Sequence, residues 1–244
     1  MAQRRPLIAG NWKMHGLKAD TGWVEAFAAA ADTGACDVLV CPPFTLLETM
    51  GGLLSRHGLA LGAQNCAEEA EGAFTGDVSA AMLADAGCSH VIVGHSERRE
   101  GHAESDALVR RKALAAIEAG LVPVICVGEH RAERESGQAV ETVLAQLAGS
   151  LPDISATQLV VAYEPVWAIG TGLTAGPEEA QAMHAAIRAA FPGADRDRLR
   201  ILYGGSVKPG NAAALMACPD VDGALVGGAS LDPDAFAQIV NLAS

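Results

Sequence analysis

The sequence predicts an α/β protein built as a closed (β/α)8 barrel, with eight parallel strands ringed by helices. Short β-rich apolar runs alternate with longer Ala-rich helical patterns, which is typical of repeated βα units around a parallel sheet. Eight such units in 244 residues fit the size of a barrel. We expect one barrel domain over residues 1–244, because no low-complexity segment or linker interrupts the series. Length alone allows two domains, and pattern alone allows an open doubly wound sheet.

Each expected strand is a short apolar run. The runs span residues 7–11, 38–41, 59–63, 90–93, 122–127, 159–163, 199–203 and 223–226. The helical patterns between them span residues 19–31, 45–57, 79–86, 104–119, 132–148, 177–190, 209–216 and 233–241. Asp232 and Gly176 are expected capping residues, each before a proline at a first helical position, and Ser105-Asp106 enriches another first turn with acid. Glycines mark three helix ends, at Gly58, Gly87 and Gly120.

Composition narrows the class of protein and its partners. Half of the residues are hydrophobic but only 4% are aromatic, so Ala, Val and Leu must fill the core. The net charge of -12 argues against a nucleic-acid binder or a partner of anionic membranes. No window approaches the ~20 apolar residues of a membrane span.

The cysteines indicate the redox environment. Six are present without any C-x-x-C pair, and several lie in or beside apolar runs, so we expect free thiols in a reducing compartment rather than a zinc site. Together with the lack of a membrane span, this predicts a cytoplasmic protein.

Glu164 lies at the end of an expected strand and beside a glycine-punctuated segment. Pro165 cannot donate to a sheet ladder, so the strand must end near Glu164. Residues 168–172 form a candidate lid, because Gly170 and Gly172 permit unusual dihedral angles while Trp167 and its neighbours stiffen one hinge. The sequence therefore predicts a base beside a lid.

Polar residues follow several other expected strands. In a barrel the loops after the strands converge on one face, so these residues become neighbours. They are Asn11 and Lys13 after the first strand, His95, Ser96 and Glu97 after the fourth, Gly204 to Ser206 after the seventh, and Gly227 to Ser230 after the eighth. Glycine-rich turns present backbone N–H groups to anions, and barrels favour phosphate sites after strands seven and eight. The candidate phosphate donors are Gly170, Ser206, Gly227 and Gly228.

These residue types fit proton abstraction beside a carbonyl group. Glu164 can take a carbon-bound proton, while His95 and Asn11 can donate hydrogen bonds to a developing oxyanion. Lys13 supplies a positive charge without a metal ion. We therefore expect no metal and no organic cofactor.

Other motifs are incomplete. The sequence around Ser96 lacks the closing glycine of a G-x-S-x-G elbow. The segment from Gly205 lacks the Gly-Lys-Ser/Thr ending of a nucleotide P-loop, and Gly170 to Gly172 lacks the full dinucleotide fingerprint. Neither a serine nucleophile nor a nucleotide cofactor is supported.

Five motifs in order resemble the triosephosphate isomerase family over nearly the whole chain. They are AGNWKM from residue 9, GAFTG from residue 72, GHSERR from residue 94, AYEPVWAIGTG from residue 162, and YGGSV from residue 203. The resemblance implies a TIM barrel that interconverts dihydroxyacetone phosphate and glyceraldehyde 3-phosphate. It implies Glu164 as the base, His95 as the electrophile, Lys13 and Asn11 steadying the enediolate, and Glu97 as a supporting, proton-handling group.

A histidine at a helix N-terminus faces the positive end of the dipole, which disfavours its protonated form. This argument favours a neutral His95, which can donate one proton and take it back.

Two alternatives remain at this point. Another phosphate-binding barrel enzyme, such as a sugar-phosphate epimerase, would share the turns after strands seven and eight but would not need the Asn11, Lys13, His95 and Glu164 set. A barrel retained only as a binding module would be credible if those residues were replaced, but all are present.

The resemblance also implies a homodimer. The loop from Cys66 to Val78 is too long for a simple βα turn and has an apolar tip, which suggests docking. In the family this loop inserts beside the partner's active site, which puts Thr75 near the partner's Asn11 and the partner's Lys13.

Three positions depart from family habit. Asp77 stands where Glu is common, Leu173 replaces a lysine at the lid tip, and Gly176 occupies a hinge usually held by Thr or Ser. We expect Asp77 to pair more weakly with Arg98, and Gly176 to raise the entropic cost of lid closure.

Overall fold

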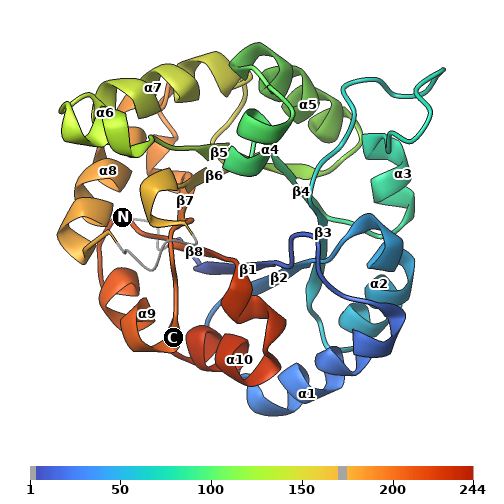
Figure 1. The fold of residues 1–244 in the computed structure, drawn as a ribbon. Coiled ribbons are helices and arrows are strands. Elements are labelled where there is room, and N and C mark those ends of the chain that lie inside the picture. The colour runs from blue at the N-terminus through green and yellow to red at the C-terminus, as the bar shows by residue number, and fades with distance from the viewer. Residues whose placement is uncertain (1–3, 170–174, 244) are drawn as a thin grey trace.

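The computed structural model describes residues 4–169 and 175–243, and these form a closed parallel barrel (Figure 1). Each strand pairs with the next, and the first also pairs with the eighth, which excludes the open doubly wound sheet. The strands are β1 (Leu7–Asn11), β2 (Asp37–Cys41), β3 (Ala60–Ala63), β4 (His90–Val93), β5 (Val122–Val127), β6 (Val160–Tyr163), β7 (Arg200–Tyr203) and β8 (Gly223–Val226). All eight predicted strands are confirmed, with bounds that agree to within one residue.

The helices form a ring outside the barrel (Figure 1). They are α1 (Trp23–Ala30), α2 (Leu47–Arg56), α3 (Ala80–Asp85), α4 (Ser96–Gly101), α5 (Asp106–Glu118), α6 (Arg131–Glu135), α7 (Ala139–Ser150), α8 (Pro177–Ala190), α9 (Pro209–Met216) and α10 (Pro233–Asn241). Short 3-10 helices are η1 (Lys18–Gly22), η2 (Phe44–Leu46), η3 (Val166–Ala168), η4 (Arg196–Arg198) and η5 (Gly228–Leu231). The predicted capping residues are confirmed: Asp232 accepts two N–H groups, and Gly176 is the N-cap residue of α8. Ser105, which was not predicted as a cap, accepts the N–H of Leu108.

Two helix predictions need correction. The helix expected over residues 132–148 is divided into α6 and α7, because Gly137 between them has a φ of +77° that no helix contains. Helix α4 was not among the expected helices. Its sequence, SERREG, has no apolar stripe, so hydrophobic periodicity could not reveal it.

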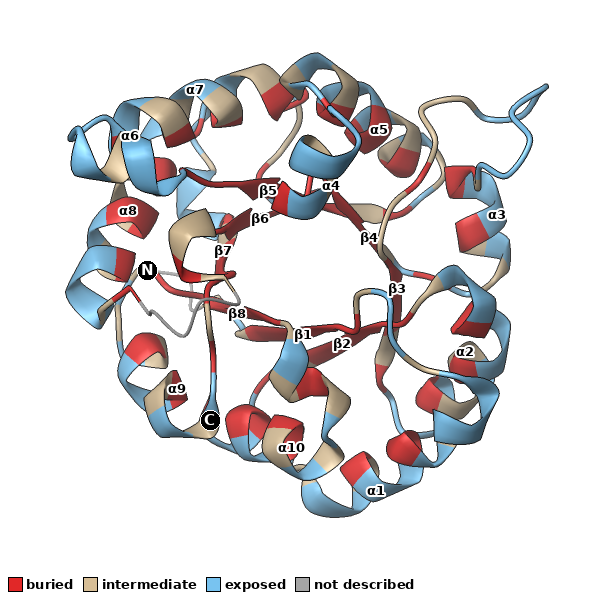
Figure 2. Cartoon of the chain, viewed as in Figure 1, coloured by how far each residue is buried: buried red, intermediate tan, exposed pale blue. Residues whose placement is uncertain are grey.

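The core has two parts, one on each face of the sheet. Alternate strand residues, among them Leu7, Ala9 and Leu39, meet inside the barrel in one cluster. The residues between them, such as Ile8 and Val40, pack outward against the helices. Because both faces are covered, the strands are buried along nearly their whole length, and the helices are buried only on their inward side (Figure 2).

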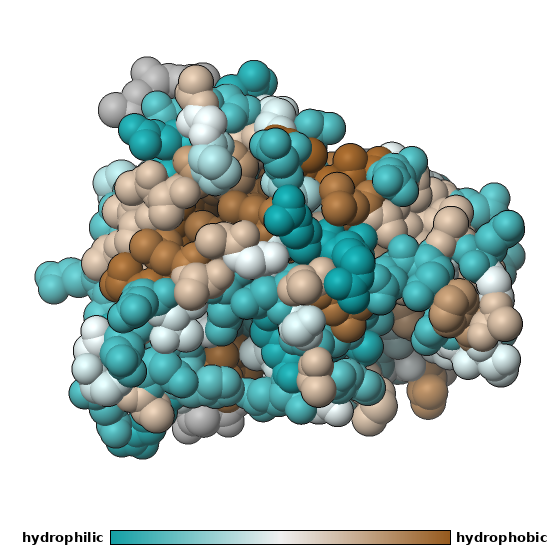
Figure 3. Space-filling view, turned by 90° about the horizontal axis from the view of Figure 1, so that it is seen from above, coloured by the Kyte–Doolittle hydropathy of each residue, from teal (hydrophilic) through white to brown (hydrophobic). Residues whose placement is uncertain are grey.

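One face of the helical ring carries hydrophobic residues across its upper half and hydrophilic residues below them (Figure 3). In the view from above, which looks onto the side that carries α5 and α7 in Figure 1, hydrophilic residues dominate the lower half of the face (Figure 3). Within the described ranges, no helix combines the length and apolar character needed to cross a membrane. The six cysteines are free thiols, five of them buried and Cys218 half-buried.

Candidate active site

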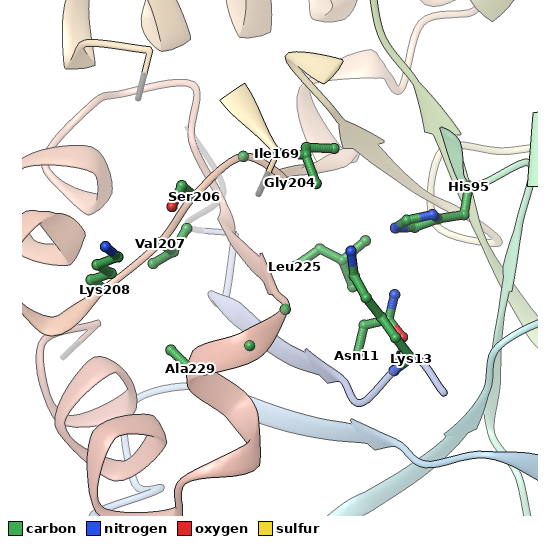
Figure 4. Close-up of a pocket in the computed structure, with 13 residues that line it drawn as sticks. Asn11, Lys13, His95, Ile169, Gly204, Ser206, Val207, Lys208, Leu225 and Ala229 are labelled. Carbon is green, nitrogen blue, oxygen red and sulfur yellow. Dashed lines mark hydrogen bonds between the residues drawn. The ribbon is translucent and has the colours of Figure 1, made fainter. Parts of the chain in front are cut away.

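A cavity of about 440 Å³ opens at the carboxyl ends of the barrel strands. Three of the predicted reactive residues, Asn11, Lys13 and His95, line one side of it, and the turns containing Ser206 and Ala229 lie opposite (Figure 4). Gly227 and Gly228 also line it. The convergence expected for a barrel is therefore found for residues that follow β1, β4, β7 and β8.

Lys13 is held in an unusual backbone conformation at the end of β1. Its φ of +52° lies in the left-handed region, which is uncommon for a residue with a side chain. Asn11 Oδ1 accepts the Lys13 N–H at 3.0 Å, and Gln64 Nε2 donates to the carbonyl oxygens of Lys13 at 2.8 Å and of Cys41 at 2.9 Å. Two side-chain amides thus fix the turn that directs the ammonium group. Gln64 was missed in the sequence, since nothing in its pattern marks it.

The Lys13 ammonium group contacts Glu97. Lys13 Nζ lies 2.5 Å from Glu97 Oε1, while Glu97 Oε2 lies 3.8 Å from His95 Nδ1. Glu97 is not among the residues that line the 440 Å³ cavity. Its carboxylate is therefore placed to orient Lys13 rather than to touch a molecule in the cavity.

His95 is the N-cap residue of α4, and its ring is almost fully buried. Its Nδ1 accepts the N–H of Glu97 at 3.2 Å, so a neutral ring carries its proton on Nε2. Nε2 in turn lies 2.9 Å from Glu164 Oε1. The N–H at the start of α4 thus occupies Nδ1 and leaves Nε2 as the nitrogen that can donate a hydrogen bond.

Glu164 directly follows β6 and is only 1% exposed. Besides the contact with His95, its carboxylate accepts the Ser96 N–H at 2.9 Å and the Ser96 hydroxyl at 3.3 Å. It does not line the 440 Å³ cavity but borders a separate recess of about 130 Å³ that also touches Cys126 and Gly128. The carboxylate must therefore leave Ser96 to reach a molecule in the larger cavity.

Glu164 and His95 shift each other's pKa. Burial of Glu164 would raise its pKa, but the His95 ring and the Ser96 N–H outweigh burial, so the pKa of Glu164 is lowered. Burial of His95 would lower its pKa, but the Glu164 carboxylate against Nε2 outweighs burial, so the pKa of His95 is raised. The helix N-terminus was expected to disfavour the protonated ring, and the Glu164 carboxylate, within hydrogen-bonding distance of Nε2, acts in the opposite direction.

The turns opposite His95 are suited to an anion. Gly205 to Val207 and Gly227 to Ala229 line the cavity and can turn backbone N–H groups toward it, whereas the N–H groups of Gly204 and Lys208 donate to Tyr163 and Asn211. Lys208 also lines the cavity and adds a positive charge that was not predicted. A Cβ on Gly227 would lie 3.5 Å from Lys13 Cε, so the absence of a side chain keeps room beside the ammonium group. Gly170, the fourth predicted phosphate donor, lies outside the described residues, as does Leu173.

A second buried carboxylate, Glu129, supports the strand that carries Glu164. Its Oε1 accepts the Tyr163 hydroxyl at 3.0 Å and the Trp167 Nε1–H at 2.9 Å. Burial raises the pKa of Glu129 despite these donors. Glu129 follows β5, so the rule that located the other strand-end residues could have found it.

No group of three or more His, Cys, Asp or Glu suited to holding a metal ion occurs in the part of the chain that the structure describes. The positive charges at the cavity come from Lys13 and Lys208.

The chain is similar to known proteins over nearly its whole length. The family model described as triosephosphate isomerase matches residues 6–243. The triosephosphate isomerase of Herpetosiphon aurantiacus is 57% identical over 97% of this chain and 98% of the relative, and that of Acidiphilium cryptum is 56% identical over 98% of each. A crystal structure of triosephosphate isomerase from Bartonella henselae superposes with a TM-score of 0.91 at 45% identity and covers 98% of both chains.

Proposed function

The chain belongs to the triosephosphate isomerase family, and from that premise we propose how its residues divide the work of the reaction. The reaction is the interconversion of dihydroxyacetone phosphate and D-glyceraldehyde 3-phosphate through an enediolate. A sugar-phosphate epimerase finds no support. The roles of the individual residues are the proposal.

Glu164 removes a proton from the carbon beside the substrate carbonyl group. The electron pair of that C–H bond becomes the second bond of the enediolate, and the carbonyl oxygen gains negative charge. His95 Nε2–H and Asn11 donate hydrogen bonds to the oxygens, and Lys13 Nζ supplies the positive charge. Glu164 then returns its proton to the neighbouring carbon, while His95 helps to move a proton between the two oxygens.

The substrate phosphate belongs on the other side of the cavity. Ser206, Gly227 and Gly228 offer the backbone donors there, with Lys208 beside them. Gly170 remains a predicted fourth donor. Binding the phosphate, which does not react, fixes the carbon atoms against His95 and lends binding energy to the chemical step.

One observation carries this proposal. Asn11, Lys13 and His95 face the phosphate turns across a single cavity, while His95 Nε2 also lies 2.9 Å from Glu164 Oε1. The donor that polarises a carbonyl and the carboxylate that takes the proton are thus in contact. Glu164 must exchange its Ser96 and His95 partners for the substrate, and this exchange frees His95 Nε2–H to donate to the carbonyl oxygen.

The test is a coupled triosephosphate assay of the wild type and Glu164→Gln. The amide cannot accept the proton, so kcat should fall by roughly 10²- to 10⁴-fold. Glu141→Gln, which changes an exposed carboxylate on α7, should match the wild type. An inactive wild type, or a fully active Glu164→Gln variant, would refute the assignment.

We propose further that two copies form a homodimer through the loop from Cys66 to Val78. This loop projects from the body between β3 and α3 (Figure 1), and Thr75 and Phe74 near its tip are exposed. Met14 in the loop after β1 is 94% exposed, which is unusual for so apolar a side chain. A partner that covers the segment around Met14 would also steady the neighbouring Lys13 turn.

Thr75→Arg tests the dimer. An arginine at the loop tip would have to be desolvated in the interface, so the variant should sediment as a single chain of 25.0 kDa while the wild type sediments at twice that mass. Val140→Arg changes a half-exposed apolar residue on α7 and should leave the dimer intact. A monomeric wild type, or a dimeric Thr75→Arg variant, would exclude this interface.

A cytoplasmic location is the third part of the proposal. Six free thiols, most of them buried, suit a reducing compartment. Fractionation of the producing cells should recover the isomerase activity with cytoplasmic marker enzymes. Recovery with periplasmic or secreted markers would contradict it.

A further inference from the structure

A second polar cavity lies at the opposite end of the barrel from the active site. Its volume is about 320 Å³, and every charged side chain that lines it is an arginine. Arg4 and Arg5 precede β1, Arg198 belongs to η4, and Arg200 begins β7. Four guanidinium groups around one cavity are unexpected in a chain with 17 basic and 29 acidic residues.

Two of these arginines have structural partners that account for their presence. Arg4 donates to Asp222 and to the carbonyl oxygens of Asp197 and Pro219. Arg5 donates to Asp37 and to three carbonyl oxygens in the segment that leads into β2. These bonds tie the N-terminal segment to the strands beside it.

The other two arginines keep donors free. Arg200 uses Nη1 to contact Asp37 Oδ2 at 2.9 Å, and its Nε and Nη2 donate to none of the described residues. No hydrogen bond or ion pair joins the exposed side chain of Arg198 to a described residue. Asp37, which serves both Arg5 and Arg200, does not line the cavity. The fold therefore explains Arg4 and Arg5 but leaves unpaired guanidinium donors at the cavity.

We propose that this cavity binds the phosphoryl group of a small phosphorylated compound. A guanidinium fork matches the oxygens of a phosphate in two parallel hydrogen bonds, and Arg198 and Arg200 offer such forks. The volume of about 320 Å³ leaves room for an organic part beside the phosphoryl group. Ala156 and Leu159 give it an apolar wall for a compact organic part, and Thr157 gives it a hydroxyl.

This site is separate from the catalytic one. The two cavities share no lining residue and lie at opposite ends of the strands. A ligand here would therefore not compete with the triose phosphate. The proposal does not depend on the roles given to Glu164 or His95.

The test combines two measurements on the full chain. Calorimetric titration with inorganic pyrophosphate gives the number of binding sites and their dissociation constants. Enzyme assays give the constant for competitive inhibition by pyrophosphate of the reaction with triose phosphate. The wild type should bind pyrophosphate at two sites per chain, of which only one agrees with the competitive inhibition constant. Arg198→Ala should weaken the other site by about tenfold or more, because it removes a charged pair of hydrogen bonds, and should leave kcat, KM and the inhibition constant unchanged. Arg198→Lys keeps the positive charge but lacks the guanidinium fork, so the affinity of its second site for pyrophosphate should lie between those of the wild type and Arg198→Ala.

Arg131→Ala provides the matched control. Arg131 is an exposed arginine on α6 that pairs with Glu135, far from this cavity in the chain. Its loss should leave both sites unchanged. A single binding site in the wild type, an unchanged second site in Arg198→Ala, or an equal loss in Arg131→Ala would each overturn the proposal, the last by showing general attraction between charges.

Discussion

At the scale of single residues, the buried pair of His95 and Glu164 governs the chemistry. A carboxylate that is 1% exposed would ordinarily be protonated, yet its pKa is lowered because a ring and an N–H group donate to it. A base must be ionised before it can remove a proton. The lowered pKa of Glu164 also stabilises the folded chain above the ordinary carboxyl pKa, and this contribution is lost as the pH falls through the lowered value.

His95→Ala should change both the rate and its pH dependence. It removes an oxyanion donor worth about 2.7 to 4 kcal/mol, so kcat should fall by roughly 10²- to 10³-fold. It also removes the largest influence that lowers the pKa of Glu164 while burial persists, so that pKa should rise. The acidic limb of the kcat/KM profile, measured in the free enzyme, should therefore move to higher pH.

The matched control for this profile is His57→Ala. His57 contacts Glu25 on the outer surface, so its loss should move neither kcat nor the acidic limb. An acidic limb that stays in place in His95→Ala would contradict the assigned role of the ring.

At the scale of elements, hydrophobic patterning was sufficient for the strands. Each is buried on both faces and therefore appears as a continuous apolar run, as in β1 and β5. Helix α4 was missed because it is short and polar. Its position depends on contacts with distant segments, since His95 contacts Glu164 after β6 and Arg99 donates to the carbonyl oxygen of Cys126 in β5. Hydrophobic periodicity can be recognised within one segment of the sequence, whereas contacts between distant segments cannot.

The site likewise has residues that the sequence could predict and residues that it could not. Strand-end positions predicted Asn11, Lys13 and His95 at the cavity, because topology alone brings those positions together. Gln64 and the withdrawn position of Glu164 could not be predicted, because both depend on side-chain geometry between distant segments.

The start of α8 offers a test at this scale. Gly176 is its N-cap residue, with an extended φ of −67° and ψ of 161°, and its N–H donates to Glu179 at 2.9 Å. A Cβ there would meet only Glu179 Oε2, at 3.9 Å, so threonine fits without strain. Gly176→Thr should stabilise the chain by about 0.4–1 kcal/mol by restricting the unfolded state. If Gly176 is a hinge, as the family resemblance implies, it should also lower KM.

Gly210→Ala separates these two effects. Gly210 lies in α9 with open space around the added methyl group, so alanine should raise the free energy of unfolding by a similar amount without changing KM. Unchanged turnover and KM in Gly176→Thr would refute the hinge.

At the scale of the whole molecule, the barrel uses its two ends differently. The carboxyl ends of the strands hold the reactive groups, and the amino ends hold the arginines that tie the N-terminal segment to β2 and β8. Closure between β1 and β8 therefore joins the beginning and the end of the described chain. That closure also makes a single cooperative domain the expected unit of unfolding.

Gly223→Ala tests closure directly. Gly223 pairs with Leu7 across the β1–β8 seam at a φ of +139°, and a Cβ there would overlap the carbonyl oxygen of Leu7 and lie 2.9 Å from its nitrogen. Neither backbone can yield without breaking the seam, so the free energy of unfolding should fall by about 3 kcal/mol or more. Urea unfolding followed by circular dichroism and by tryptophan fluorescence should give one coincident transition in both proteins, at lower urea in the variant. Gly210→Ala serves again as the control, because its added methyl group meets open space. An unchanged urea midpoint in Gly223→Ala would show that the β1–β8 seam contributes little to the free energy of unfolding. Two separated transitions in the wild type would contradict a single domain.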